Sequence, residues 1–179
     1  MLLKGIRVLD LSTLLPGPMC SLFLADLGAE VIKVESLNGD LMRGFESYSK
    51  QSPYFSALNR NKKSIALNLK TLEGKKIFMK LAKDADVIIE GFRPGKIDSL
   101  GVGYNKVKKI NPKIIYCSIT GYGQKGAYKN KAGHDLNYVA LSGVLNVISK
   151  KPFVAGVQIA DVSSALVAAF AIVSSLLYR

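Results

Sequence analysis

The sequence predicts one α/β domain over residues 1–179, built on a doubly wound, mostly parallel, Rossmann-like sheet. Three observations lead to this fold class. Short apolar runs alternate with helical segments along the chain, which is typical of a parallel sheet with helices on both faces. A length of 179 residues suits a single domain with a full core. Neither an internal repeat nor a low-complexity linker divides the chain.

The first elements form a β-α-β unit. Residues 6–11 are a short apolar run and predict a buried strand. Pro16 starts a helix that continues through residues 19–27, because proline is well placed in a first helical turn, and Gly28 ends it. Residues 30–35 predict the second strand. The single connecting helix favours a parallel pair with a right-handed crossover.

The middle of the chain continues the alternation. Residues 38–54 are polar and contain glycine, so we expect a loop. A strand is expected over residues 63–69, and a helix over residues 73–83 with Thr71 as its N-cap. Residues 86–90 then predict another buried strand.

The last elements follow the same order. We expect a helix over residues 104–110, a strand over residues 113–119 and a helix over residues 135–145. Asp161 starts the final helix as its N-cap, where the helix dipole would favour the ionised carboxylate.

The charge balance predicts an anionic partner. The net charge is +12, from 25 Lys and Arg against 13 Asp and Glu, which suits a nucleic acid, an acidic lipid or a phosphorylated cofactor. The basic residues are dispersed and no nucleic-acid motif is present, so we expect no nucleic-acid partner. Residues 162–178 carry no charge, but serine and alanine dilute them, and a buried helix is favoured over a membrane span.

Cysteine usage points to a reducing compartment. Cys20 and Cys117 are far apart, without a CxxC motif and without histidine at ligand spacing. We therefore expect no metal site and no disulfide, in agreement with a cytoplasmic protein.

Ligands of doubly wound sheets bind beyond the carboxyl ends of the strands. Here these points include residues 13–17, 90–93 and 120–123, several of them turns rich in glycine or proline. Neither GxGxxG after the first strand nor GxxxxGK[ST] is present, which disfavours dinucleotide and P-loop sites.

Two side chains are candidates for acid-base chemistry. His134 is the only histidine, and Asp161 opens the final helix. A histidine and a carboxylate that face one substrate carbon can transfer a proton across it. From the residue pattern alone, a structural role for His134 near a turn is slightly favoured.

Several segments, in the same order, resemble the family III CoA-transferases, and within them the α-methylacyl-CoA racemases. They are residues 5–11, 16–18, 27–35, 61–64, 90–95, 121–124, and 132–137 with 141–143. Members of that family are longer and form interlocked homodimers. The resemblance therefore implies that residues 1–179 are the N-terminal portion of this architecture, a truncated large domain.

The resemblance implies acyl-CoA chemistry without a prosthetic group. Asp161 and His134 are implied as the two bases that epimerise the α-carbon of 2-methylacyl-CoA thioesters, and we favour this racemase activity. The alternative is a CoA-transferase in which Asp161 carries CoA as an aspartyl thioester and His134 is dispensable. A third possibility is an inactive CoA-binding fragment, because parts of the family's active site lie beyond Arg179.

The resemblance also implies a set of CoA-binding residues. Leu67, Lys70 and Arg93 match positions that hold the nucleotide, and Asp135 and Tyr138 match the thioester end. The full implied set is Leu14, Leu67, Lys70, Gly91, Phe92, Arg93, Gly133, Asp135 and Tyr138.

Overall fold

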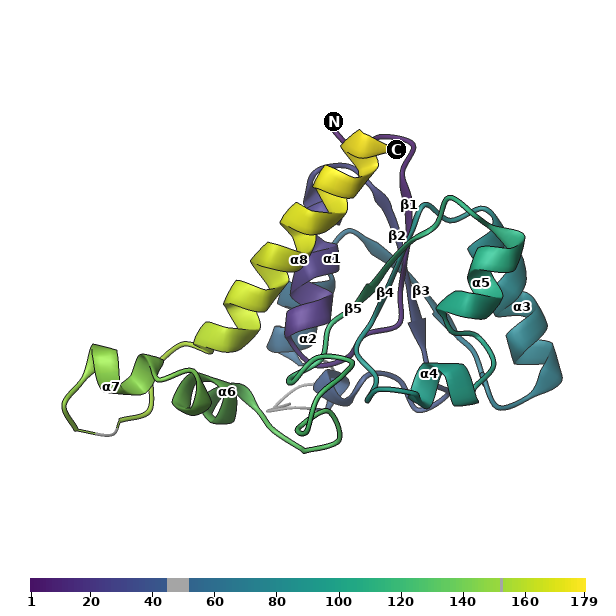
Figure 1. The fold of residues 1–179 in the computed structure, drawn as a ribbon. Helices are drawn as coiled ribbons and strands as arrows, with labels where there is room; N and C mark the ends of the chain where they lie inside the picture. The colour runs from purple at the N-terminus through teal and green to yellow at the C-terminus, as the bar shows by residue number, and fades with distance from the viewer. Residues whose placement is uncertain (45–51, 152) are drawn as a thin grey trace.

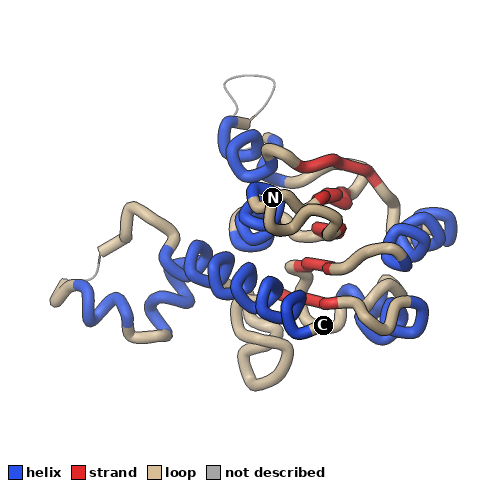
Figure 2. Tube along the Cα trace, turned by 90° about the horizontal axis from the view of Figure 1, so that it is seen from above, coloured by secondary structure: helices blue, strands red, loops and turns tan. Residues whose placement is uncertain are grey.

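Five parallel strands form one sheet, with helices on both faces (Figure 1). The computed structural model describes residues 1–44, 52–151 and 153–179. The strand order is β3-β2-β1-β4-β5, so the direction of winding reverses between β1 and β4. The view from above shows the sheet lying between its helical layers (Figure 2). The predicted doubly wound parallel sheet is confirmed.

Most elements lie where the sequence predicts them. They are β1 Arg7–Asp10, α1 Pro16–Asp26, β2 Glu30–Glu35, β3 Lys62–Ala66, α3 Leu72–Lys83, β4 Val87–Glu90, α5 Tyr104–Ile110 and β5 Ile115–Ser118. Thr71 caps α3 as expected, since its hydroxyl accepts a hydrogen bond from the Gly74 amide at 3.2 Å. Gly28, at φ +102°, follows the end of α1 in a backbone conformation that favours glycine.

Three short helical elements lie where the sequence predicted none. They are η1 Leu41–Arg43, α2 Pro53–Asn59 and α4 Lys96–Ser99. The Asp40 side chain caps η1 and the Ser52 side chain caps α2, so local side-chain caps form turns too short to show a helical period. Part of the predicted loop at residues 38–54, namely residues 45–51, lies outside the described residues.

Two predicted helix boundaries were wrong. The helix expected over residues 135–145 is two helices, α6 Asp135–Leu141 and α7 Val144–Ile148, because Gly143 adopts φ +79° between them. The final helix, α8 Ile159–Tyr178, begins two residues before Asp161, with Gln158 at the N-cap position.

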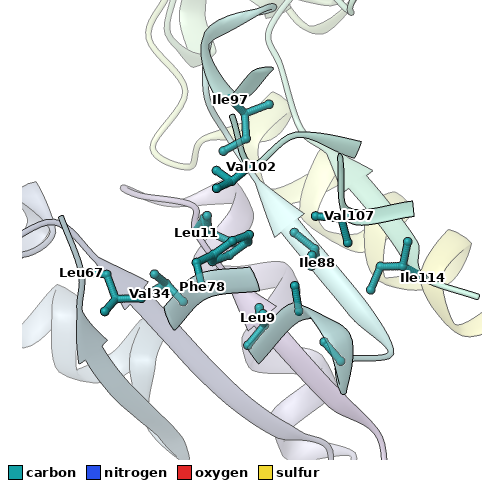
Figure 3. Packing of buried hydrophobic residues seen from close by; sticks show 12 residues of the cluster. Leu9, Leu11, Val34, Leu67, Phe78, Ile88, Ile97, Val102, Val107 and Ile114 are labelled. Atoms are coloured by element: carbon teal, nitrogen blue, oxygen red, sulfur yellow. The ribbon is translucent and has the colours of Figure 1, made fainter. Parts of the chain in front are cut away.

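Each face of the sheet carries its own core. On one face, Phe78 of α3 is fully buried and packs in a cluster with Leu9, Ile88 and Val107 (Figure 3). On the other face, α1 and α8 cover the sheet and bury a second cluster that includes Leu24 and Ile172. The two clusters hold the strands rigidly, so the loops at the strand ends start from fixed positions.

Helix α8 buries only one narrow face, which corrects the expectation of a buried helix. Ala165 and Ile172 face the core, whereas Phe170 is 76% exposed and Leu166 and Val167 are also exposed. By length and composition alone, α8 could cross a membrane. In the structure it packs along α1 and the edge strand β5 (Figure 1).

Candidate active site

The loops that follow β1, β4 and β5 meet at one edge of the sheet. A side chain built at Gly91, after β4, would place its Cβ 3.7 Å from the Ser12 Cβ and 3.8 Å from the Ile119 carbonyl oxygen. Ser12 follows β1 and Ile119 follows β5, so three loops are in contact beside the point where the winding reverses. This is the usual place for a ligand in a doubly wound sheet.

The CoA-binding residues predicted for the nucleotide lie along the same edge. Leu14 follows β1, residues 91–93 follow β4, and Leu67 and Lys70 follow β3. Lys70 and Arg93 are both exposed, and neither forms an ion pair with another described residue. Leu67 is 7% exposed and packs in the core, so only its backbone can reach a ligand.

A buried carboxylate shapes the loop after β4. Glu90 is 1% exposed, and its Oε2 accepts a hydrogen bond from the Phe92 amide at 2.8 Å. Burial raises the pKa of Glu90, and the hydrogen bonds from Ser118 and the Phe92 amide oppose this rise only in part. This hydrogen bond fixes the turn through Gly91, one of the residues predicted to bind CoA.

Tyr138 joins the start of α6 to the loop after β5. Its hydroxyl donates to the Gly133 carbonyl oxygen at 2.6 Å, and its ring lies edge-on to Tyr122 at 5.1 Å between centroids. Any side chain at Gly121 would overlap the Tyr138 ring. Burial, followed by the neighbouring Tyr122 and Asp161, raises the pKa of Tyr138. The Tyr138 hydroxyl thus uses its proton in the hydrogen bond to Gly133, and its oxygen is free to accept a hydrogen bond from a ligand.

Asp135 caps α8, the role that the sequence analysis gave to Asp161. The Asp135 Oδ1 accepts from the Ala160 amide at 2.6 Å and from the Asp161 amide at 3.1 Å. Asp161 is the third residue of the helix and is not its N-cap. The prediction failed because the capping carboxylate comes from α6, 25 residues earlier in the chain.

Asp161 is half-buried and its carboxylate is uncommitted. Burial, followed by the charge of Asp135, raises its pKa, and His134 lowers it by a smaller amount. The shift is opposite to the expectation that the helix terminus favours the ionised form, because burial and the Asp135 charge both disfavour it. Among the described residues, no hydrogen bond reaches the Asp161 side chain. Such a carboxylate is suited to act as a nucleophile or a base.

His134 and Asp161 belong to the same site. His134 is exposed and directly precedes α6, where its amide donates to the Asn137 Oδ1 at 2.9 Å. Asp135, the next residue, accepts hydrogen bonds from the Ala160 and Asp161 amides, which brings the start of α6 against the start of α8. The fold thus brings together the two residues that the sequence analysis singled out as catalytic candidates.

A cavity of about 260 Å³ opens beside His134 and Asp135. Its lining consists of His134, Asp135, Leu136, Val139, Leu145 and residues 154–158. A hollow of about 300 Å³ lies elsewhere, near Asp86, Lys113 and Arg179 at the amino ends of β4 and β5. We assign the first cavity to the site, because the second is at the opposite edge of the sheet from the catalytic candidates.

Neither cysteine suits a reactive role. Burial raises the pKa of Cys117 to about 11, and burial also raises the pKa of Cys20. Both thiols are therefore protonated at neutral pH, and a protonated thiol is a poor nucleophile. In the part of the chain that the structure describes, no three His, Cys, Asp or Glu side chains are arranged to hold a metal ion.

Sequence reasoning missed a group of buried charges behind the β1–α1 loop. Lys33 Nζ lies 2.8 Å from Asp40 Oδ2, and Lys62 Nζ lies 3.4 Å from Asp10 Oδ2. A signal was present, because Lys33 lies between Ile32 and Val34 in the strand predicted over residues 30–35. A charge at such a position requires a buried partner.

Comparisons with known proteins identify the family of the chain. The sequence model for CoA-transferase family III matches residues 3–179. A succinyl-CoA:glutarate CoA-transferase of Mus musculus is 45% identical over 183 residues, which cover 99% of this chain and 42% of the relative. An α-methylacyl-CoA racemase of Mus musculus is 41% identical over 150 residues, which cover 84% of this chain and 36% of the relative.

A solved structure shows the same fold. A CAIB/BAIF family protein from Brucella suis superposes with a TM-score of 0.93 at 38% identity, over 98% of this chain and 49% of that protein. The chain thus spans less than half the length of these relatives. The parallel sheet and the family match over almost the whole sequence lead to one conclusion: the chain belongs to CoA-transferase family III.

Proposed function

We propose that residues 1–179 form the nucleophile-bearing, acyl-CoA-binding part of a CoA-transferase. The observation that carries this proposal is the pattern of relatives. The mouse CoA-transferase matches 99% of the chain, whereas the mouse racemase matches 84% at lower identity. This support reverses the order favoured in the sequence analysis, where epimerisation of 2-methylacyl-CoA came first. The uncommitted carboxylate of Asp161 agrees with the transferase mechanism.

In this mechanism Asp161 is the covalent nucleophile. Its carboxylate attacks the thioester carbonyl, the C–S bond breaks, and the CoA thiolate departs. The acyl group is then joined to the aspartate as a mixed anhydride. The thiolate then attacks the aspartyl carbonyl, which releases the first acid and leaves an aspartyl-CoA thioester. A second carboxylate attacks that thioester, and the thiolate attacks the new acyl group, which regenerates Asp161. The cycle needs no prosthetic group and no oxidant.

The site's charges support a CoA ligand. Lys70 and Arg93 are exposed at the carboxyl edge of the sheet without ion-pair partners among the described residues. Their charges are available to the phosphates of CoA. Leu136, Val139 and Leu145 give the 260 Å³ cavity an apolar wall that is available to an acyl chain. We propose a reducing cytoplasm as the setting, since both cysteines are free.

The deciding experiment separates transfer from epimerisation. The chain is completed at its C-terminus with the corresponding part of the mouse CoA-transferase, and this completed enzyme is incubated with an acyl-CoA in deuterated water. We expect CoA exchange only when an acceptor acid is present, no deuterium at the α-carbon, and trapping of Asp161 by hydroxylamine. His134→Ala should retain transfer. Deuterium at the α-carbon without acceptor, lost in His134→Ala, would instead support the racemase. CoA binding by residues 1–179 without any turnover of the completed enzyme would support the inactive fragment.

We also propose that the protein is a homodimer, and the outer face of α8 supports this. Its exposed apolar residues are Leu166, Val167, Phe170, Leu177 and Tyr178. Contiguous apolar surface of this kind marks an interaction site. We expect sedimentation velocity to show a dimer, and Phe170→Lys to shift it to monomer. Lys76→Glu on α3, at the opposite face of the sheet, should leave the dimer intact. A wild-type monomer at all concentrations would refute the proposal.

A further inference from the structure

The loop between β1 and α1 contains a strained residue. Leu14 adopts φ +65°, in the left-handed region that a leucine side chain disfavours. Backbone strain of this kind persists only where the surrounding structure holds it, and it is concentrated at ligand-binding segments. The loop lies beside Gly91, at the point where the strand order reverses.

A buried ion pair holds this loop from behind. The Asp40 Oδ1 accepts from the Leu14 amide at 3.4 Å, and Lys33 Nζ donates to the Ser12 carbonyl oxygen at 2.9 Å. The two charged groups lie 2.8 Å apart, with side chains 2% and 0% exposed. Lys33 therefore binds the residue before the exposed Thr13, and Asp40 binds the residue after it.

The pair itself has little freedom to move. Asp40 Oδ1 also accepts from the Met42 amide at 2.9 Å, and the Asp40 amide donates to Glu35 Oε2 at 2.9 Å. The Glu35 carboxylate in turn accepts from Arg43 Nε at 2.8 Å and from Arg43 Nη2 at 2.6 Å. A chain of polar contacts thus connects the loop to β2 and η1.

We infer that the Lys33–Asp40 pair is a positioning device that holds Leu14 in its left-handed conformation and fixes residues 12–15 for ligand binding. A buried ion pair adds little stability compared with an apolar pair of similar size, whereas it defines one geometry. The inference rests on the proposed function for the identity of the ligand, coenzyme A. Lys33 and Asp40 act through the loop and do not touch the ligand themselves.

The test uses Asp40→Asn in the full chain, with two readouts. Amide hydrogen exchange of residues 11–15 reports the loop, and calorimetric titration with coenzyme A reports binding. If the ordered loop becomes a minor state, about 10% populated, the dissociation constant rises about 10-fold and exchange accelerates. Leu14→Asn should recover part of both losses in the Asp40→Asn background, because asparagine adopts positive φ more readily than leucine.

A matched control separates positioning from general destabilisation. Asn111→Ala removes two hydrogen bonds, to the Ala82 and Ala85 carbonyl oxygens at 3.0 and 2.7 Å, away from the loop. We expect it to lower the melting temperature without changing loop exchange or coenzyme A affinity. If Asp40→Asn does not fold, the Lys33→Met/Asp40→Asn double variant replaces it, since that variant leaves no unpaired buried charge.

The inference is overturned if a folded Asp40 variant shows the wild-type exchange rate over residues 11–15. It is also overturned if the exchange rate there rises no more than in Asn111→Ala. Failure of the wild-type chain to bind coenzyme A would refute the proposed ligand, and the exchange comparison would still decide whether the pair positions the loop. Faster exchange together with rescue by Leu14→Asn supports it.

Discussion

Asp161→Asn is expected to abolish CoA transfer in the completed enzyme, by about 10⁴-fold or more, while coenzyme A binding persists. Asparagine has nearly the shape of aspartate but offers no carboxylate to attack the thioester. No hydrogen bond among the described residues depends on the Asp161 side chain, so the exchange removes the nucleophile without breaking a contact.

The raised pKa of Asp161 gives this prediction a second signature. In the folded state the carboxyl group retains its proton at a pH where the unfolded chain has lost it, mainly because burial penalises the charge. Stability contributed by this group therefore falls as pH rises between the unfolded and folded pKa values. At pH 7 the asparagine variant should melt at a higher temperature than wild type, and the difference should vanish in acid below the usual aspartate pKa.

Activity should follow the same titration. The nucleophile must be ionised, so the acid limb of the wild-type transfer rate is expected above the usual aspartate range. Asp84→Asn, an exposed site before β4, is the control and should change neither rate nor melting temperature. Transfer retained in Asp161→Asn, at a rate near wild type, would contradict the mechanism.

The largest loss of stability is expected for Asp10→Ala, about 3–5 kcal/mol. The Asp10 side chain is fully buried, accepts from the Ser21 hydroxyl at 2.5 Å and from the Ser12 amide at 2.9 Å, and lies 3.4 Å from Lys62 Nζ. Its removal takes away the nearest counter-charge of the buried Lys62 amino group and leaves a cavity. Urea denaturation at pH 7 measures the loss.

The pH dependence follows from the pKa of Asp10. Burial raises this pKa, but Lys33, Lys62 and the hydroxyls of Ser12 and Ser21 together outweigh burial and lower it. Asp10 therefore contributes stability above the usual aspartate pKa, and the contribution is lost as pH falls toward the lowered folded value. The wild-type advantage over Asp10→Ala should shrink in acid.

The partner variant tests the same pair from the other side. Burial lowers the pKa of Lys62 to about 8, even though Asp10 opposes the shift. Asp10→Ala/Lys62→Met leaves no unpaired charge and should recover part of the stability lost in Asp10→Ala. A double variant as unstable as the sum of both single variants would show that the pair is not coupled.

The sequence by itself determined the sheet. Strands β1 and β4 were predicted because each lies in a short, mainly apolar run, which is how a strand buried on both faces is encoded locally. Strand β2 was predicted as the strand that follows the first helix, although charged residues lie among its apolar ones. The Thr71 cap and the glycine after α1 are equally local signals. The family resemblance was also readable from the order of its segments, and the family match over residues 3–179 confirms it.

Only the tertiary structure decided the state of the site. Asp161 was expected to be a helix cap with a favoured charge, yet Asp135 caps the helix and burial raises the pKa of Asp161. The left-handed conformation of Leu14 also gave no clear local signal. The physical reason is distance along the chain. Hydrophobic period and capping depend on neighbours within a few residues, whereas desolvation and charge pairing depend on groups brought together by folding, 25 residues apart for Asp135 and Ala160 and 52 for Asp10 and Lys62.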